Sequence, residues 1–199
     1  MSIKYKNSTA DVLNWTDALY LINRLEKDGN YTITLFVAVS IFFGTRVSDT
    51  LSLKWGDLLN EDLTIKSEIE LTEKKTKKFR KITINQDLGK LIKTCYANIK
   101  PATLDKHLFV SQKKSVYTIQ RLNTILKEKK VEYNINIKNF SCHSLRKCFG
   151  SELYRRGEKS EYMLVKLSII FNHSSTAITR RYIGINDVEI ANSYDLLTF

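Results

Sequence analysis

A histidine and an arginine near the C-terminal end of the chain are the residues best suited to act on a phosphate group. His143 and Arg146 are three positions apart, in a segment where Leu145, Phe149 and Leu153 recur every four residues. This spacing predicts a helix with one buried stripe and places His143 and Arg146 on neighbouring positions of one face. The start of a helix adds free N–H groups and partial positive charge. The segment therefore predicts a receptor for a phosphate.

A second arginine follows a long apolar segment. Residues 31–43 are apolar almost all round, which predicts a buried central helix, and Gly44 and Thr45 end it just before Arg46. Arginine is rarely buried without a partner. Position alone leaves two interpretations open: an ion pair with Asp49, or an inward guanidinium that binds a phosphate while Asp49 steadies it.

The densest run of positive charge lies between two segments with the alternation of β-strands. Residues 69–72 and 81–84, with residues 63–65 before them, alternate apolar and polar side chains, which predicts a small three-stranded antiparallel sheet. The basic hairpin tip between the last two strands fits a DNA groove or backbone, although charged runs are more often solvated turns. One of its lysines could also donate a proton. The predicted DNA contacts are Lys74, Lys77, Lys78 and Arg80.

Composition points to a globular protein with a polyanionic partner. The net charge is +11 over 199 residues, with 43% hydrophobic and 27% charged residues. A basic domain of this size usually meets a polyanion, and nucleic acid is the leading candidate. The alternative is a solvated lysine-rich surface that aids solubility.

Metal, secretory and membrane roles find little support in the sequence. The spacing of Cys142, His143, Cys148 and His173 matches none of the common structural zinc patterns, so we predict no metal site. The N-terminus lacks the apolar run of a signal peptide. The longest apolar stretch, residues 33–43, is too short to span a bilayer. We expect a cytoplasmic protein without a membrane partner.

The remaining segments predict a single helical domain that positions these residues. Amphipathic patterns predict helices over residues 14–27, 87–98, 116–130 and 160–171. Ser174 or Ser175 can cap a short helix that presents Tyr182. Without repeats or a flexible linker, we expect a polar lead-in over residues 1–13 and one domain over residues 14–199. Its tail, residues 187–199, is expected to be helical and to pack on this protein's own core or on a neighbouring copy.

Taken in order, these motifs resemble the tyrosine recombinases, the phage integrase family. The resemblance covers about residues 14 to 190. It rests on residues 44–49 and 53–57, the basic hairpin, residues 143–146, and His173 nine positions before Tyr182 with Thr179 between them. Any one motif would be weak, but the ordered set is specific.

The resemblance implies a fold, a reaction and a role for each residue. The fold is mainly α-helical with a small three-stranded antiparallel sheet. A tyrosine hydroxyl attacks a DNA phosphodiester, becomes linked to the 3′-phosphate and releases a 5′-hydroxyl, with no cofactor. The implied roles are Tyr182 as nucleophile, Arg46 and Arg146 as phosphate ligands, His143 as assistant to proton transfer, His173 as hydrogen-bond donor to the phosphate, Lys75 as general acid and Asp49 as an orienting residue. Lys74, Lys77 and Lys78 lie close enough to leave the choice of acid open.

The resemblance also implies partners, and three departures accompany it. We expect double-stranded DNA, a monomer in isolation, a tetramer on recombining DNA, accessory DNA-bending proteins in some systems, and association with the bacterial nucleoid when DNA is bound. Asn172 replaces the usual glycine, Asp49 stands where many members carry Glu, and Lys147 stands where His or Arg is common. We expect the separate helical DNA-binding domain of the family to be absent from this chain.

Three alternatives share part of this pattern. A type IB topoisomerase, which relaxes DNA, or a telomere resolvase would use the same chemistry. A decayed integrase would only bind DNA. A metal-dependent nuclease would need clustered carboxylates, and no such cluster accompanies the motifs.

Overall fold

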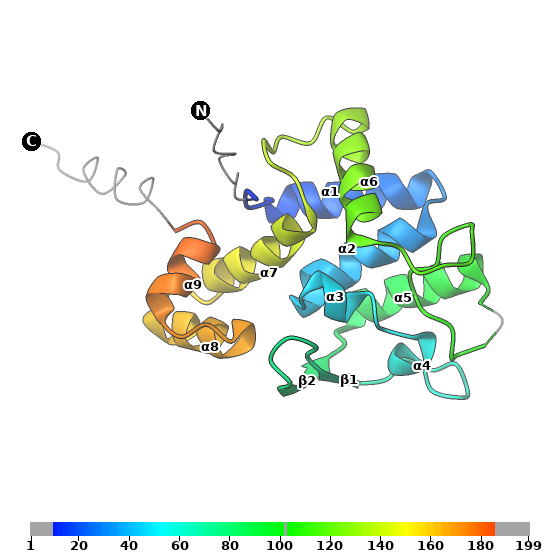
Figure 1. Cartoon of the computed structure of the whole chain (residues 1–199), viewed down its shortest axis with the longest axis horizontal. Helices are drawn as coiled ribbons and strands as arrows, with labels where there is room; N and C mark the ends of the chain where they lie inside the picture. Colours follow the sequence, from blue (N-terminus) through cyan, green and yellow to red (C-terminus); the bar gives the residue numbers. More distant parts are fainter. Residues whose placement is uncertain (1–9, 102, 186–199) are drawn as a thin grey trace, which may run out of the picture.

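The computed structural model describes residues 10–101 and 103–185, which fold into helices and one small hairpin (Figure 1). The helices are α1 (Trp15–Lys27), α2 (Tyr31–Phe43), α3 (Val47–Thr50), α4 (Trp55–Leu58), α5 (Gln86–Ile99), α6 (Ile119–Glu132), α7 (Cys142–Arg156), α8 (Glu161–Phe171) and α9 (Thr176–Tyr182). The strands are β1 (Glu68–Thr72) and β2 (Phe79–Thr83). The predicted lead-in is only partly covered, and the predicted tail helix over residues 187–199 lies outside the described residues.

Helix α2 forms the centre of the fold, as its apolar sequence predicts. It packs against α1, α5 and α7, and most of its side chains are buried. Gly44 ends the helix with a left-handed backbone (φ 57°), and a Cβ at this position would clash with the ring of Phe149. This tight stop is what turns the chain so that Arg46 follows directly on the buried helix.

A second, smaller core lies beneath the C-terminal helices. Tyr154, Leu164, Leu167, Phe171 and Ile183 form a buried cluster between α7, α8 and α9. Gly150 in α7 permits the close approach, because a Cβ there would lie 2.7 Å from Ile183 and from Phe171. The cluster holds α9 and its last residue against α7.

The fold class is confirmed, but the sheet has two strands within the described residues instead of the three predicted. Strands β1 and β2 are antiparallel, with Ile69 opposite Ile82. The expected first strand, residues 63–65, does not form: its pairing is limited to an isolated antiparallel bridge between Leu59 and Ile65, which follows a tight turn. Leu63 has a left-handed backbone (φ 64°), and the Asp62 carboxylate accepts hydrogen bonds from the N–H and hydroxyl of Thr64. The side chain of Asp62 thus competes with strand pairing.

Helix α7 covers the segment of His143 and Arg146 in which the sequence predicts a helix, and its first turn is capped on both sides. The Ser141 hydroxyl accepts from the His143 N–H at 3.3 Å, and the Ser144 hydroxyl accepts from the Ser141 N–H at 3.2 Å. This reciprocal cap fixes the first turn, which carries His143. None of the helices within the described residues is long and apolar enough to cross a membrane.

Candidate active site

The backbone carbonyl of Phe171 holds the two predicted phosphate ligands side by side. It accepts hydrogen bonds from Nη2 of Arg46 and from Nη2 of Arg146, each at 3.2 Å. Phe171 is the last residue of α8, where carbonyl groups lack helical partners and carry partial negative charge. Two arginines a hundred positions apart therefore share one anchor, with their remaining N–H groups available to other partners.

Arg146 is buried and has one donor left over. The residue is 5% exposed, and its guanidinium lies 4.6 Å from the centre of the Phe171 ring. Its Nη1 is buried and donates no hydrogen bond within residues 10–101 and 103–185. Burial lowers the pKa of Arg146 to about 10, so it stays positively charged at neutral pH. An orphaned buried donor costs about 1–3 kcal/mol, which an incoming anion would relieve.

Tyr182 completes an aromatic cluster on the same anchor. Its ring packs edge-on against Phe171 at 5.2 Å and against His173 at 5.1 Å between centroids. Burial raises the pKa of Tyr182, and the positive charges of Arg146 and Arg46 offset only part of the rise. The hydroxyl is therefore protonated at neutral pH, and it would need a base to act as a nucleophile. Below, Arg46, Arg146, His173 and Tyr182 around Phe171 are called the arginine floor.

A chain of hydroxyl groups orients His173. Its Nδ1 contacts the Thr179 hydroxyl at 3.0 Å, Thr179 contacts the Ser168 hydroxyl at 2.8 Å, and Ser168 donates to the Leu164 carbonyl at 2.8 Å. Thr179 is fully buried. Because Nδ1 is engaged, Nε2 is the ring nitrogen left for the site. Burial, with the charges of Arg146 and Arg46, lowers the pKa of His173, which favours the neutral ring.

His143 lies in the first turn of α7, three residues before Arg146 of the floor. The residue is exposed, yet partial burial of its ring, together with the charges of Arg146 and Lys147, lowers its pKa. A neutral imidazole at pH 7 can accept a proton.

The ion pair of Arg46 is with Glu73, so the ion pair with Asp49, one of the two interpretations that its position left open, is not formed. Nη1 of Arg46 donates to Oε2 of Glu73 at 2.5 Å. Asp49 is fully buried and accepts instead from the backbone N–H of Lys74 at 2.9 Å. Asp49 thus holds the backbone of the hairpin tip, whereas the side chain of Arg46 points towards Glu73 and the Phe171 carbonyl.

Glu73 is a residue of the site that sequence reasoning missed. It is fully buried and also accepts from Thr76 at 2.5 Å and from Arg80 at 3.2 Å. Within a charged run it looked like a solvated residue. A signal was nevertheless present, since Ile69, Leu71 and Glu73 fall on alternate positions, and the first two face the core.

The basic residues of the hairpin tip divide into two groups. Lys74, Lys75 and Lys77 are exposed, and none has a side-chain partner in the described part of the chain. Lys78 donates to the Asn172 side chain. Arg80 departs from the expected DNA contact, because it points inward to Glu73 and to the Phe43 carbonyl. Residues 73–78 are called the lysine turn below.

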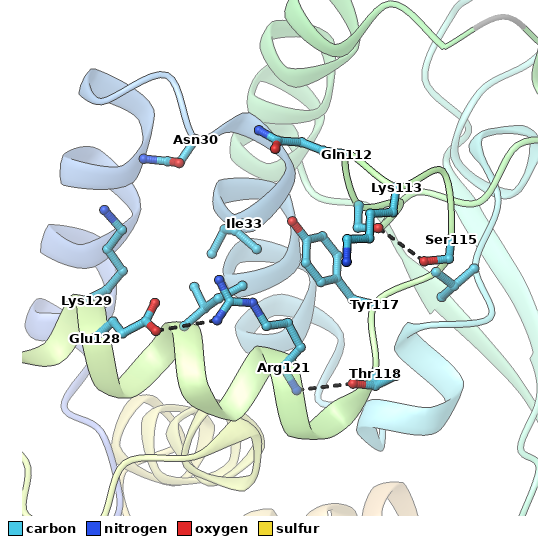
Figure 2. Close-up of a pocket in the computed structure, with 13 residues that line it drawn as sticks. Asn30, Ile33, Gln112, Lys113, Ser115, Tyr117, Thr118, Arg121, Glu128 and Lys129 are labelled. Atoms are coloured by element: carbon cyan, nitrogen blue, oxygen red, sulfur yellow. Dashed lines mark hydrogen bonds and ion pairs between the residues drawn. The ribbon is translucent and has the colours of Figure 1, made fainter.

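A cavity of about 530 Å³ lies elsewhere, between the start of α2, the loop over residues 111–118 and α6 (Figure 2). It shares no residue with the floor or the turn. Arg121 is paired with Glu128 at 3.4 Å, as Figure 2 shows, and Lys129 is paired with Glu132 outside the lining. The lining holds no histidine, cysteine or aspartate, and its one carboxylate, Glu128, is paired with Arg121, so the cavity offers little for catalysis.

No group of three or more His, Cys, Asp or Glu able to hold a metal ion is found among residues 10–101 and 103–185. The cysteines Cys95, Cys142 and Cys148 are free and buried. Burial raises the pKa of each to about 12, so all three are thiols at neutral pH.

Comparison with known proteins tests the family resemblance independently of the site's geometry. The family model described as "Phage integrase family" matches residues 12–189. A "Probable integrase/recombinase YoeC" of Bacillus subtilis (strain 168) is 35% identical over 170 residues, which is 84% of this chain and 83% of that protein. "Tyrosine recombinase XerC" of Caldanaerobacter subterraneus subsp. tengcongensis is 27% identical over 177 residues, 85% of this chain and 46% of that protein.

A solved structure agrees in fold. XerH site-specific recombinase bound to palindromic difH substrate matches with a TM-score of 0.70 and 19% identity, over 98% of this chain and 55% of that one. This chain therefore spans about half the length of XerC and of XerH.

Proposed function

This chain belongs to the phage integrase family, the tyrosine recombinases, and from that membership we propose that it breaks and rejoins DNA strands at specific sites through a covalent bond between Tyr182 and a 3′-phosphate. The relatives named above are recombinases by name, and one was solved on its substrate. The chemistry assigned to individual residues here is our own inference from the arginine floor.

The orphaned donor of Arg146 is the observation that carries the proposal. Nη1 of Arg146 is buried, charged and without an acceptor in the part of the chain that the structure describes. Arg46 lies on the same Phe171 carbonyl, and the ring of Tyr182 packs on the same phenyl group. A phosphodiester on this floor would meet two guanidinium groups beside a tyrosine, which suits charge that builds on non-bridging oxygens during attack.

The cleavage step balances without a cofactor. Oη of Tyr182 attacks the phosphorus, and the bond from phosphorus to the 5′-oxygen breaks. The proton of the tyrosine passes to a neutral histidine, which we assign as His143. The leaving 5′-oxygen takes a proton from Lys75. Attack by a 5′-hydroxyl on the phosphotyrosine reverses the step and rejoins a strand, so that the bond energy is conserved. Nε2 of His173 supports the phosphate, with Thr179 holding the ring in place.

The lysine turn supplies the contacts to the rest of the DNA in this proposal. Lys74 and Lys77 extend from the surface beside the floor and neutralise backbone phosphates, while Lys78 and Arg80 hold the turn in place. We further infer that recombination involves a tetramer on paired DNA sites and a monomer in isolation, with DNA-bending proteins in some systems. We place residues 14–199 in a single catalytic domain.

The polarity of the covalent bond tests this function. Pooled nicked duplexes, which trap the intermediate, are labelled on either side of the nick and incubated with protein in EDTA. We expect an SDS-resistant adduct that carries the fragment ending in a 3′-phosphate. An adduct on a 5′-phosphate, or cleavage that EDTA abolishes, would contradict the proposal. Relaxation of supercoiled plasmid without a specific site would favour the topoisomerase alternative.

A further inference from the structure

Glu73 is the only acidic residue in the run over residues 73–80, and it is fully buried. Its two carboxylate oxygens are both in use. Oε2 accepts from Nη1 of Arg46 and from the hydroxyl of Thr76, each at 2.5 Å, and Oε1 accepts from Nη1 of Arg80 at 3.2 Å. One carboxylate thus joins an arginine of the floor to the turn that carries the lysines.

The contacts of Glu73 and Asp49 fix the backbone on both sides of Lys75. Before it, the N–H of Lys74 donates to Asp49 at 2.9 Å. After it, Thr76 donates its hydroxyl to Glu73, and the N–H of Lys77 donates to the Glu73 carbonyl at 2.9 Å. Lys75 itself is exposed. Its position therefore depends on its neighbours and not on contacts of its own side chain.

We propose that Glu73 is a positioning residue, which sets Lys75 at the leaving 5′-oxygen and Arg46 at the phosphate through one shared carboxylate. The inference rests on the proposed function and deepens it. Because Oε2 serves Arg46 and Thr76 together, a displacement of the turn changes the geometry of the guanidinium as well. The Glu73 carboxylate then positions both the general acid, Lys75, and the phosphate ligand, Arg46.

The charge of Glu73 suits this role. Burial alone would raise its pKa, but hydrogen bonds from Thr76, Arg46 and Arg80 outweigh burial, and the pKa is lowered. The carboxylate is therefore ionised at neutral pH. Nη1 of Arg46 is held by Glu73 and Nη2 by the Phe171 carbonyl, so the plane of the guanidinium is fixed from two sides.

A sulfur-substituted substrate separates positioning of the acid from other effects. When sulfur replaces the bridging 5′-oxygen of the DNA, the released strand leaves as a 5′-thiolate. Because a thiol has a pKa of about 8.5, this leaving group needs no proton from a general acid. On ordinary DNA, Glu73→Gln should lower the rate of single-turnover cleavage about 100-fold, since small displacements of reacting groups carry such costs. On the sulfur substrate the loss should be at least about tenfold smaller, because a general acid contributes about 10²–10⁴-fold.

Matched variants complete the test. Glu70→Gln removes an exposed carboxylate of β1 that pairs with Lys81 at 2.9 Å, and it should cleave both substrates at the rate of the unmodified protein. Lys75→Ala should show the same relief by sulfur, and adding Glu73→Gln to it should cost less than Glu73→Gln alone. Thr76→Val, which keeps the carboxylate charged, should show a smaller loss on ordinary DNA. Equal losses of Glu73→Gln on both substrates, or none on either, would overturn the inference.

Hydrogen exchange tests the anchoring without any activity. The amides of Lys74 and Lys77 should exchange faster in Glu73→Gln than in Glu70→Gln, and unchanged exchange would overturn the inference. If the unmodified protein forms no adduct on either DNA while these amides respond, it is the proposed function that fails, and Glu73 remains the anchor of the turn.

Discussion

The arginine floor and the lysine turn carry neighbouring parts of one proposed reaction, yet they are held in different ways. The floor is packed: Arg146 is 5% exposed and Phe171 is fully buried beneath it. The turn is held by a few polar contacts to Asp49, Glu73 and Asn172, and its free lysines are exposed. Elements with few buried apolar contacts open more readily. The proposed phosphate site is therefore held by packing, whereas the position of the turn depends on a few polar contacts.

The largest loss should follow a change in the floor that keeps the charge. Arg146→Lys retains one positive charge but loses the planar fork that reaches both Phe171 and a phosphate oxygen. We expect single-turnover cleavage at saturating DNA to fall about 10²–10³-fold, as when one transition-state donor is removed. Arg155→Lys, an exposed position on the same helix, is the control. Near-normal cleavage by Arg146→Lys would show that the floor does not bind the phosphate.

The pH profile tests the proton transfer beside the floor. The pKa values of His143 and His173 are lowered from 6.5, so both rings are neutral at pH 7. A neutral base loses activity when it is protonated, so cleavage should fall with pH only below 6.5. His143→Gln should remove that limb and lower the rate about 100-fold. A midpoint above 6.5, or an unchanged profile in His143→Gln, would exclude His143 as the base.

A smaller effect should follow when the support of His173 is removed. Thr179→Val keeps the buried volume but loses the hydroxyl that contacts Nδ1. Loss of one hydrogen bond of about 1.4 kcal/mol corresponds to about tenfold in cleavage rate. Thr179→Ser should restore the rate, and DNA affinity should be the same in all three proteins. An effect on affinity alone would argue against orientation of the histidine.

The smallest effect should come from an exposed lysine of the turn. Lys77→Ala should weaken DNA binding a few-fold and reduce the slope of log K against log salt by about 0.9, the value for one phosphate contact. Cleavage of bound DNA should not change. Titrations at several salt concentrations, with Lys93→Ala on α5 for comparison, measure this. An unchanged salt slope would remove Lys77 from the DNA interface.

The residues of the arginine floor were easier to predict from the sequence than the contacts of the lysine turn. The predicted residues Arg46, His143, Arg146, His173 and Tyr182 lie in motifs with recognisable spacing. The structure brings Arg46, Arg146, His173 and Tyr182 onto Phe171, and His143 lies one turn before Arg146 in α7. Their catalytic roles stay predictions. The anchor itself was not predictable, because a backbone carbonyl has no side-chain signature.

The turn was harder to predict because long-range polar contacts decide it. Glu73 reaches Arg46 across 27 positions, and Asp49 meets Lys74 across 25. Charge patterning could not choose between a solvated and a buried carboxylate. The strand predicted over residues 63–65 does not form for a local reason. Asp62 closes a turn in a segment whose alternation alone predicted strand pairing.

Trapping of the covalent intermediate with Tyr182→Phe tests the central claim most directly. The unmodified protein and the variant are incubated with the same pool of nicked duplexes and resolved in SDS. We expect an adduct with the unmodified protein and none with Tyr182→Phe, which removes only the attacking oxygen and keeps the ring packed on Phe171 and His173. An adduct of equal yield with Tyr182→Phe would mean that another residue attacks the DNA, and it would contradict the assignment of the arginine floor as the catalytic centre.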